Sequence, residues 1–262
     1  MKNRANDLDG KQWLKYSFSI WRDIAKTKDE RKLSHPAMFP TALTSRLIEI
    51  FSKKSEIILD PFLGSGTTIL SAYVLGRKGI GVELSKKYIN LSKKRLKELS
   101  KSIDNEVYDS KILNINSLYV KKFLKKNSVD LVITSPPYWN ILNEKRSADY
   151  KKIKKYSEKD EDLGNIGDYK FFLEKLKSVF SETYELLKKN KYCIVIVMDI
   201  RKKSQFYPFH MDLVKKMEEI GFTLDDIIIW DRQAEYNNMR PLGYPYVFRI
   251  NKVHEFILIF KK

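Results

Sequence analysis

A short unit near residue 60 restricts the folds open to this chain more than any other part of the sequence. Residues 56–60 (EIILD) have the pattern of a buried strand, residues 62–66 (FLGSG) that of a tight glycine loop, and residues 67–76 that of a helix ending at a glycine. A second apolar strand, GIGVEL at residues 79–84, follows directly. This order of strand, loop, helix and strand predicts parallel strands joined by a crossover helix.

The same alternation continues along most of the chain. Apolar residues recur at helical spacing between Leu43 and Phe51, from Ser85 to about Ser100, from Tyr169 to Leu187 and from Phe209 to Ile220. Apolar runs typical of strands lie at residues 111–115, 129–134, 192–200, 226–230 and 254–260. We therefore predict an α/β, Rossmann-like fold. Its sheet has seven mostly parallel strands, helices on both faces and an antiparallel C-terminal edge formed by the last two strands.

We expect one main domain preceded by an arm. Residues 1–34 are polar and charged with interleaved aromatic residues, so this arm is expected to pack on the body or to touch a ligand. Residues 35–262 contain no internal repeat and no low-complexity linker. Within them, residues 140–167 are charged and helix-poor, and the stretch exceeds the roughly 12 to 15 residues above which structureless loops are uncommon. We expect a mobile insertion there that acts as a lid or a binding loop.

The composition excludes several classes of protein. Cys193 is the single cysteine and the three histidines are scattered, so disulfide scaffolds and zinc modules are excluded and no metal is expected. No apolar run approaches the roughly 20 residues that span a bilayer, and the N-terminus lacks a signal-peptide pattern, so we expect a cytoplasmic protein without membrane contact. The chain has 50 Lys and Arg against 33 Asp and Glu, a formal net charge of +17. This charge favours a polyanionic partner, although Lys-rich surfaces also serve solubility.

The glycine loop after the first strand has the position of a ligand site, because doubly wound sheets bind ligands beyond the carboxyl ends of their strands. Gly64 and Gly66 allow a tight turn, and Glu83 ends the next strand at close to the roughly 20-residue spacing of an acid that binds a ribose diol. Ile69 replaces the third glycine of a dinucleotide fingerprint, and no lysine follows the loop as it would in a P-loop. A nucleoside ligand without pyrophosphate fits better, and S-adenosylmethionine is such a ligand. An ordinary strand–turn–helix is the alternative.

The fourth strand runs into a stiff loop, TSPPYW at residues 134–139. Two prolines fix φ and remove two N–H donors, so this strand end offers carbonyl and hydroxyl acceptors beside an aromatic ring. Ser135 Oγ and the Pro136 carbonyl could hold both hydrogens of an exocyclic amine and free the nitrogen lone pair to attack a methyl group. Tyr138 would stack on the base and offset part of the cost of extruding it from a duplex. A proline-rich ligand for a partner domain and an ordinary strand-end turn are the alternatives.

Four motifs together resemble those of the amino DNA methyltransferases: DPFLGSGTT, GVELS, TSPPYW and HPAMFP. These enzymes transfer a methyl group from S-adenosylmethionine to N4 of cytosine or N6 of adenine, and the resemblance covers most of residues 35–139. It implies the seven-stranded methyltransferase fold and a catalytic loop of Ser135, Pro136, Pro137 and Tyr138. It also implies a cofactor site made of Phe39, Pro40, Asp60, Pro61, Phe62, Gly64, Ser65, Gly66, Thr67, Thr68, Glu83, Leu84, Asn116, Ser117 and Thr134. Asn116 departs from the acidic residue often found in the family, but an amide can also bind an adenine edge.

Ser135 favours cytosine as the target base, because adenine enzymes of the family more often carry Asp or Asn there. A hydroxyl can hold either amine, so N6-adenine DNA methylation stays open. RNA methylation at an exocyclic amine also stays open, since related RNA enzymes carry a similar loop. A binding-only regulator is disfavoured by the intact motifs. We predict site-specific methylation of cytosine N4 in double-stranded DNA; a cognate restriction endonuclease is compatible with this function, and no stable complex with it is implied.

Little of the chain remains for a separate recognition domain after Trp139. Reading of the DNA sequence is therefore assigned to the 140–167 insertion, the N-terminal arm and the connection over residues 231–252. The residues expected to contact DNA are Trp139, Lys151, Lys152, Lys154, Lys155, Arg232, Arg240 and Arg249. A solvated loop is an equally good interpretation of the four lysines, because acidic residues follow them at once.

Overall fold

The computed structural model describes residues 4–33, 38–102, 110–141, 161–235 and 241–262. Most of the predicted 140–167 insertion, including Lys151, Lys152, Lys154 and Lys155, lies outside the described residues, as does Arg240. Among the helices of the described residues, none combines the length and the apolar character that crossing a bilayer would require.

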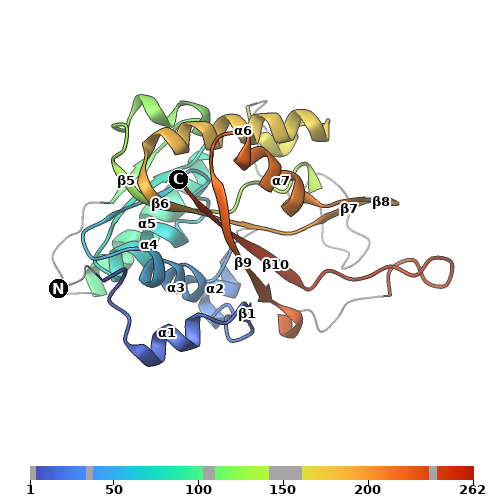
Figure 1. Ribbon diagram of the computed structural model, residues 1–262, viewed down its shortest axis with the longest axis horizontal. Helices are drawn as coiled ribbons and strands as arrows, with labels where there is room; N and C mark the ends of the chain where they lie inside the picture. The colour runs from blue at the N-terminus through green and yellow to red at the C-terminus, as the bar shows by residue number, and fades with distance from the viewer. Residues whose placement is uncertain (1–3, 34–37, 103–109, 142–160, 236–240) are drawn as a thin grey trace.

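Eight strands form one twisted sheet in the order β1-β9-β10-β6-β5-β2-β3-β4 (Figure 1). Their bounds are β1 (Ile20–Trp21), β2 (Ile57–Asp60), β3 (Lys78–Val82), β4 (Lys111–Leu113), β5 (Val129–Thr134), β6 (Leu187–Val197), β9 (Thr223–Asp231) and β10 (His254–Lys261). Strand β10 is antiparallel to both β6 and β9, and the other pairings are parallel. A separate hairpin consists of β7 (Ile200–Lys202) and β8 (Gln205–Tyr207).

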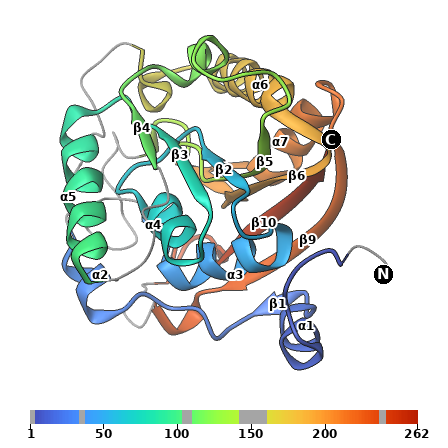
Figure 2. The same cartoon turned by 90° about the vertical axis from the view of Figure 1, so that its left-hand side faces the viewer.

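Helices cover both faces of the sheet (Figures 1 and 2). One face packs against the helices α6 (Tyr169–Leu186) and α7 (Phe209–Glu218) and the 3₁₀ helix η1 (Ser117–Lys122). The other face packs against α3 (Thr41–Phe51) and α4 (Thr67–Val74), with α5 (Lys86–Ser102) beside α4. The short elements are α1 (Gly10–Tyr16), α2 (Lys28–Lys32), η3 (Leu163–Asn165) and η4 (Gln233–Glu235).

The predicted fold class is confirmed, and all seven predicted strands are present, but the sheet differs from the expectation in one detail. The N-terminal arm contributes an eighth strand, in which Ile20 pairs with Ile229 and buried Trp21 pairs with Trp230. A strand of two residues in a polar segment has no periodicity from which to predict it. The predicted antiparallel pair of the last two strands is confirmed as β9 and β10, with β10 between β6 and β9 and with only β1 beyond β9. Residues 257–260 are all buried, as suits a strand covered on both faces.

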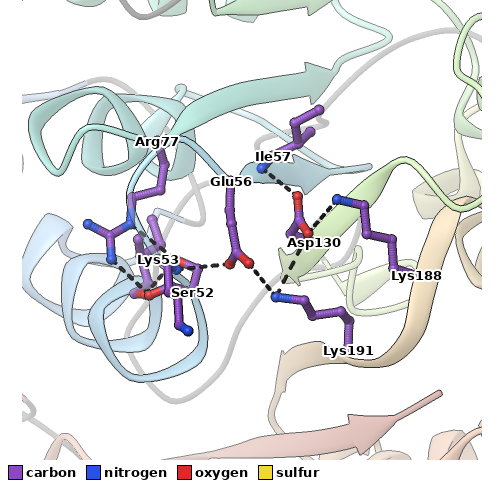
Figure 3. A network of polar contacts seen from close by, with 9 residues as sticks. Ser52, Lys53, Glu56, Ile57, Arg77, Asp130, Lys188 and Lys191 are labelled. Atoms are coloured by element: carbon purple, nitrogen blue, oxygen red, sulfur yellow. Dashed lines mark hydrogen bonds and ion pairs between the residues drawn. The ribbon is translucent and has the colours of Figure 1, made fainter. Parts of the chain in front are cut away.

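Charged residues gather at the amino ends of the central strands (Figure 3). Asp130 of β5 accepts hydrogen bonds from the backbone N–H of Ile57 (3.0 Å) and from Lys188 Nζ (2.7 Å). Lys191 Nζ forms an ion pair of 2.5 Å with Glu56 and one of 3.8 Å with Asp130. At this edge of the sheet the carboxylates are therefore neutralised by lysines of the same chain.

Candidate functional site

The carboxyl ends of β2 and β5 bring the two sequence-predicted loops together. The strands are adjacent and parallel, so Asp60 and Thr134 lie at the same edge of the sheet. The Thr134 hydroxyl donates a hydrogen bond of 2.7 Å to Asp60 Oδ1. The glycine loop after β2 and the proline loop after β5 therefore begin at one point, as a shared site for a cofactor and a target base requires.

Asp60 is fully buried and accepts hydrogen bonds from three neutral donors. Besides Thr134, these donors are the Thr68 hydroxyl (2.6 Å) and the backbone N–H of Phe62 (2.9 Å). Burial raises the pKa of Asp60 to about 6, because removal from water disfavours the charged form more than the three hydrogen bonds favour it. The carboxylate thus fixes the start of both loops and titrates close to neutral pH.

The glycine loop has a conformation that only glycine adopts easily. Gly64 has φ 56° and Gly66 has φ 90°, and a Cβ at Gly66 would lie 2.9 Å from the side chain of Ser92. Ser92 Oγ donates to the Gly64 carbonyl (2.9 Å), and Arg95 Nη1 donates to the Ser65 carbonyl (2.6 Å). Two residues of α5 therefore fix the backbone of the glycine loop through its carbonyl groups. Neither Ser92 nor Arg95 was among the predicted site residues, although Tyr88, Ser92 and Arg95 share one helix face by their spacing.

Glu83 stands at the end of β3 beside this loop, as predicted. Its side chain is nearly buried, with 4% exposed, and accepts the backbone N–H groups of Gly64 (2.9 Å) and Ser85 (2.6 Å). Asn114, which the sequence analysis did not select, donates to the carbonyls of Glu83 (3.0 Å) and Leu84 (3.2 Å). Glu83 therefore connects the end of β3 to the glycine loop.

Two further predicted segments lie beside the same loop. Asn116 Oδ1 accepts the N–H of Leu118 (3.0 Å) and caps η1, and Ser117 Oγ donates to the Pro61 carbonyl. Arg95 also lies 3.4 Å from Thr67 Oγ1 and 3.9 Å from Met38 Sδ. The segment 38–40, with half-buried Phe39 and with Pro40 at the start of α3, is thereby placed next to the glycine loop.

The proline loop is held from the C-terminal half of the chain. Ser135 Oγ donates to the Tyr138 hydroxyl (3.3 Å), which donates to Glu255 Oε2 of β10 (2.8 Å). Arg232 in turn pairs with both Glu255 and Glu235. Burial and the adjacent Glu255 carboxylate raise the pKa of Tyr138 well above its usual value, so its phenol stays protonated. The hydroxyl of Tyr138 is thus anchored, and Glu255 is a positioning residue that lies far from the loop in sequence.

Two of the residues predicted to contact DNA have other roles in the structure. Trp139 is 5% exposed and packs edge-on against Tyr169 and Tyr207, with ring centroids 5.2 and 5.1 Å away. Its φ is 49°, and the indole is part of the core on this face of the sheet. Arg232 is engaged by two carboxylates, and its side chain is 16% exposed. We therefore do not retain Trp139 or Arg232 as DNA contacts.

Comparison with known proteins identifies the family. A family model described as DNA methylase, of the N6/N4 methyltransferase type, matches residues 1–94 and 129–262. The chain belongs to this DNA methylase family.

Curated relatives agree over shorter stretches. Type II methyltransferase M.ScaI of Streptomyces caespitosus is 40% identical over 79 residues, which is 30% of this chain and 26% of the relative. Orphan methyltransferase M.BamHII of Bacillus amyloliquefaciens is 42% identical over 84 residues (30% and 32%). Type II methyltransferase M.BglI of Bacillus subtilis is 33% identical over 129 residues (49% and 36%). The chain thus aligns with about a quarter to a third of the length of these relatives.

Solved structures share the fold. Precorrin 8W decarboxylase of Methanobacterium thermoautotrophicum has a TM-score of 0.53 at 10% identity, covering 91% of this chain and 96% of that one. An S-adenosylmethionine-dependent methyltransferase of Methanosarcina mazei has a TM-score of 0.52 at 13% identity, covering 82% and 96%. S-adenosylmethionine is the cofactor of this family.

The residues at the carboxyl edge fit this cofactor. Glu83 supplies a carboxylate at the end of β3, which is the acceptor that a ribose diol needs. Asp60 supplies a second, fully buried carboxylate whose donors are neutral, and the backbone of the glycine loop approaches the same region without Cβ atoms at positions 64 and 66. These two carboxylates therefore suit a ligand that has hydroxyl groups and a positive charge.

Proposed function

We propose that this protein methylates DNA at the exocyclic N4 of a cytosine that is extruded from the duplex, with S-adenosylmethionine as the methyl donor. The observation that carries the proposal is the hydrogen bond from Thr134 to Asp60, because it connects the cofactor loop directly to the loop expected to hold the base. Membership in the DNA methylase family supports transfer to an amino nitrogen of DNA.

In the proposed reaction the chain binds the cofactor, orients the target base and polarises its amino group. Asp60, Glu83 and the glycine loop would hold the cofactor, which supplies an electrophilic methyl group when bound. Ser135 Oγ and the Pro136 carbonyl would accept the two amino hydrogens of the base. These hydrogen bonds localise the lone pair on the nitrogen and align it for attack. The bonds from Ser135 to Tyr138 and from Tyr138 to Glu255 fix the geometry of this loop before the base arrives.

The choice of cytosine rests on Ser135. The adenine enzymes that the sequence resembles more often carry Asp or Asn here, whose second polar atom gives a different hydrogen-bonding pattern. The test is incubation of the protein with tritiated S-adenosylmethionine and genomic DNA, followed by identification of the labelled nucleoside. We expect label in N4-methylcytosine. Label in N6-methyladenine alone would show that cytosine is not the target base. Label that appears only in tRNA added as a competitor would show that the nucleic acid is wrong.

A serine variant tests the role of the proline loop. Ser135→Ala is expected to bind S-adenosylmethionine like the wild type but to lower turnover at least about tenfold, the equivalent of one hydrogen bond of about 1.4 kcal/mol in the transition state. Ser128→Ala is the matched control, since Ser128 precedes the same strand at its other end and donates only to the Lys125 carbonyl. Turnover of Ser135→Ala equal to that of the control would refute the proposed amine contact.

A further inference from the structure

Two segments at the carboxyl edge expose large apolar side chains. They are the β7–β8 hairpin (residues 200–207) and residues 241–252, which we call together the aromatic flap. Tyr244 is 79% exposed, Tyr246 91% and Phe248 95%. Figure 1 shows both segments extending from the body on the same side. Since exposed apolar patches of this kind mark interaction surfaces, the flap calls for a partner.

The flap is basic as well as aromatic. Its cations are Arg201, Lys202, Lys203, Arg249 and Lys252, and neither segment contains Asp or Glu. Arg201 and Lys252 lie over the ring of Phe206, at 5.4 and 5.0 Å from its centroid. Cations beside exposed aromatic rings complement the phosphates and base edges of a nucleic acid better than the mixed charges of a protein surface.

The aromatic side chains stand on a formed turn. The N–H groups of Tyr246 and Val247 donate to the Gly243 carbonyl at 2.9 and 2.8 Å. Gly243 has φ 79°, and a Cβ there would lie 2.1 Å from the Val247 carbonyl oxygen, so the turn requires glycine. Arg249 Nη1 donates to the Lys203 carbonyl (2.6 Å) and connects this turn to the hairpin. The two segments therefore present one surface.

This surface adjoins the proline loop. Lys202 Nζ lies 4.2 Å from the centroid of the Trp139 ring and donates to Asn140 Oδ1 (3.1 Å). Trp139 directly follows Tyr138, so the hairpin contacts the chain next to the residues expected to hold the target base. A polymer docked on the flap would thus lie beside the catalytic edge.

We propose that the aromatic flap is the surface on which the DNA duplex docks, with Tyr246 and Phe248 contacting bases and Lys203 and Lys252 contacting phosphates. The inference rests on the proposed function, which it extends from the target base to the flanking duplex. It also places a DNA-contacting surface on the connection before β10.

The test measures binding of a labelled duplex by fluorescence anisotropy at several salt concentrations. The double variant Tyr246→Ala/Phe248→Ala is expected to bind at least about tenfold more weakly, with an unchanged dependence on salt. Phe123→Ala/Phe171→Ala removes two aromatic rings that are 54% and 52% exposed, directly after η1 and on α6, and should bind like the wild type. Equal losses in both double variants would overturn the assignment.

A second pair of variants isolates the phosphate contacts. Lys203→Gln/Lys252→Gln is expected to reduce the slope of log affinity against log salt by about 2, one for each lost phosphate contact. Lys97→Gln/Lys101→Gln on the exposed side of α5 removes the same charge and should leave the slope close to that of the wild type.

Failure of this inference is separable from failure of the proposed function. If the wild type binds S-adenosylmethionine in calorimetry but neither binds nor methylates DNA, the proposed function is wrong. If the wild type methylates DNA and the flap variants bind and methylate it equally well, the flap is not the docking surface. If the flap variants keep DNA binding and instead lose self-association in size-exclusion chromatography, the surface is an interface between copies of the chain, and the proposal is overturned.

Discussion

Asp60 and Asp130 lie on neighbouring strands, and both are buried. They lie at opposite edges of the sheet, however, and their hydrogen-bond partners differ in charge. Asp130 is paired with Lys188 and lies near Lys191, whereas Asp60 accepts only from hydroxyl and backbone N–H groups. The lysines at the amino edge neutralise Asp130 within the chain. The neutral donors at the carboxyl edge orient Asp60 without neutralising it.

We propose that this difference separates a structural carboxylate, Asp130, from a functional one, Asp60. A buried carboxylate without a cation is costly, and a fold retains it where a ligand supplies the missing charge. S-adenosylmethionine carries positive charge, so the carboxyl edge has the electrostatics of a binding site and the amino edge those of a closed network.

The largest expected effect comes from removing the functional carboxylate. Asp60→Ala should lower turnover by more than about 100-fold and weaken binding of S-adenosylmethionine, because it leaves three buried donors without an acceptor, at about 1–3 kcal/mol each. Isothermal calorimetry and a methylation assay measure the two effects. Binding and turnover close to those of the wild type would remove the distinction between the two edges.

The next largest effect is expected from a change in the conformation of the glycine loop, which should weaken cofactor binding. Gly66→Ala forces a Cβ into the left-handed region and against Ser92, which we expect to weaken cofactor binding about tenfold or more. Gly76→Ala is the matched control, since Gly76 has a similar φ of 73° but lies at the far end of α4. If both variants bind the cofactor equally well, the loop geometry is unimportant.

The affinity for S-adenosylmethionine should depend on pH through Asp60. As pH falls through about 6, Asp60 becomes protonated and loses its charge, so affinity for S-adenosylmethionine should be about tenfold lower at pH 5 than at pH 7. Asp60→Asn should remove this dependence.

The stability of the fold should respond in the opposite sense. The pKa of Asp60 is raised above its usual 3.8, so the folded chain binds the proton more tightly than the unfolded one. The contribution of this group is therefore greatest below about pH 4, and up to about 3 kcal/mol is lost as pH rises through 6. Urea unfolding of wild type and Asp60→Asn at several pH values measures the difference, and parallel profiles would contradict it.

The smallest effect is expected at the amino edge. Asp130→Asn should cost about 1 kcal/mol of stability, because the Lys188 and Lys191 side chains are 43% and 28% exposed and water replaces part of the lost interaction. Methylation should stay at the wild-type rate. A large loss of activity in this variant would show that the edges are coupled.

The sequence was sufficient to predict features that follow directly from local pattern. Asp60, Glu83 and Thr134 each end an apolar run, so their common edge follows from the order of strands and helices. Contacts between distant segments were not predictable in this way. Glu255 reaches Tyr138 across 117 positions, and no local pattern marks such a pair. Trp139 is buried against Tyr169 and Tyr207, which lie 30 or more positions away in the chain, and its position beside Tyr138 does not reveal these contacts.

Strand β1 has a consequence for how the protein can be handled. Its two residues pair with Ile229 and Trp230 near the end of β9, and the Ser19 carbonyl accepts the Ile229 N–H at 2.8 Å. A chain shortened to begin at Pro36 would keep every strand-end residue of the site, but it would remove the strand that pairs with β9 at Ile229 and Trp230. An uncovered strand of this kind invites sheet extension from molecule to molecule, so the arm protects the protein against aggregation.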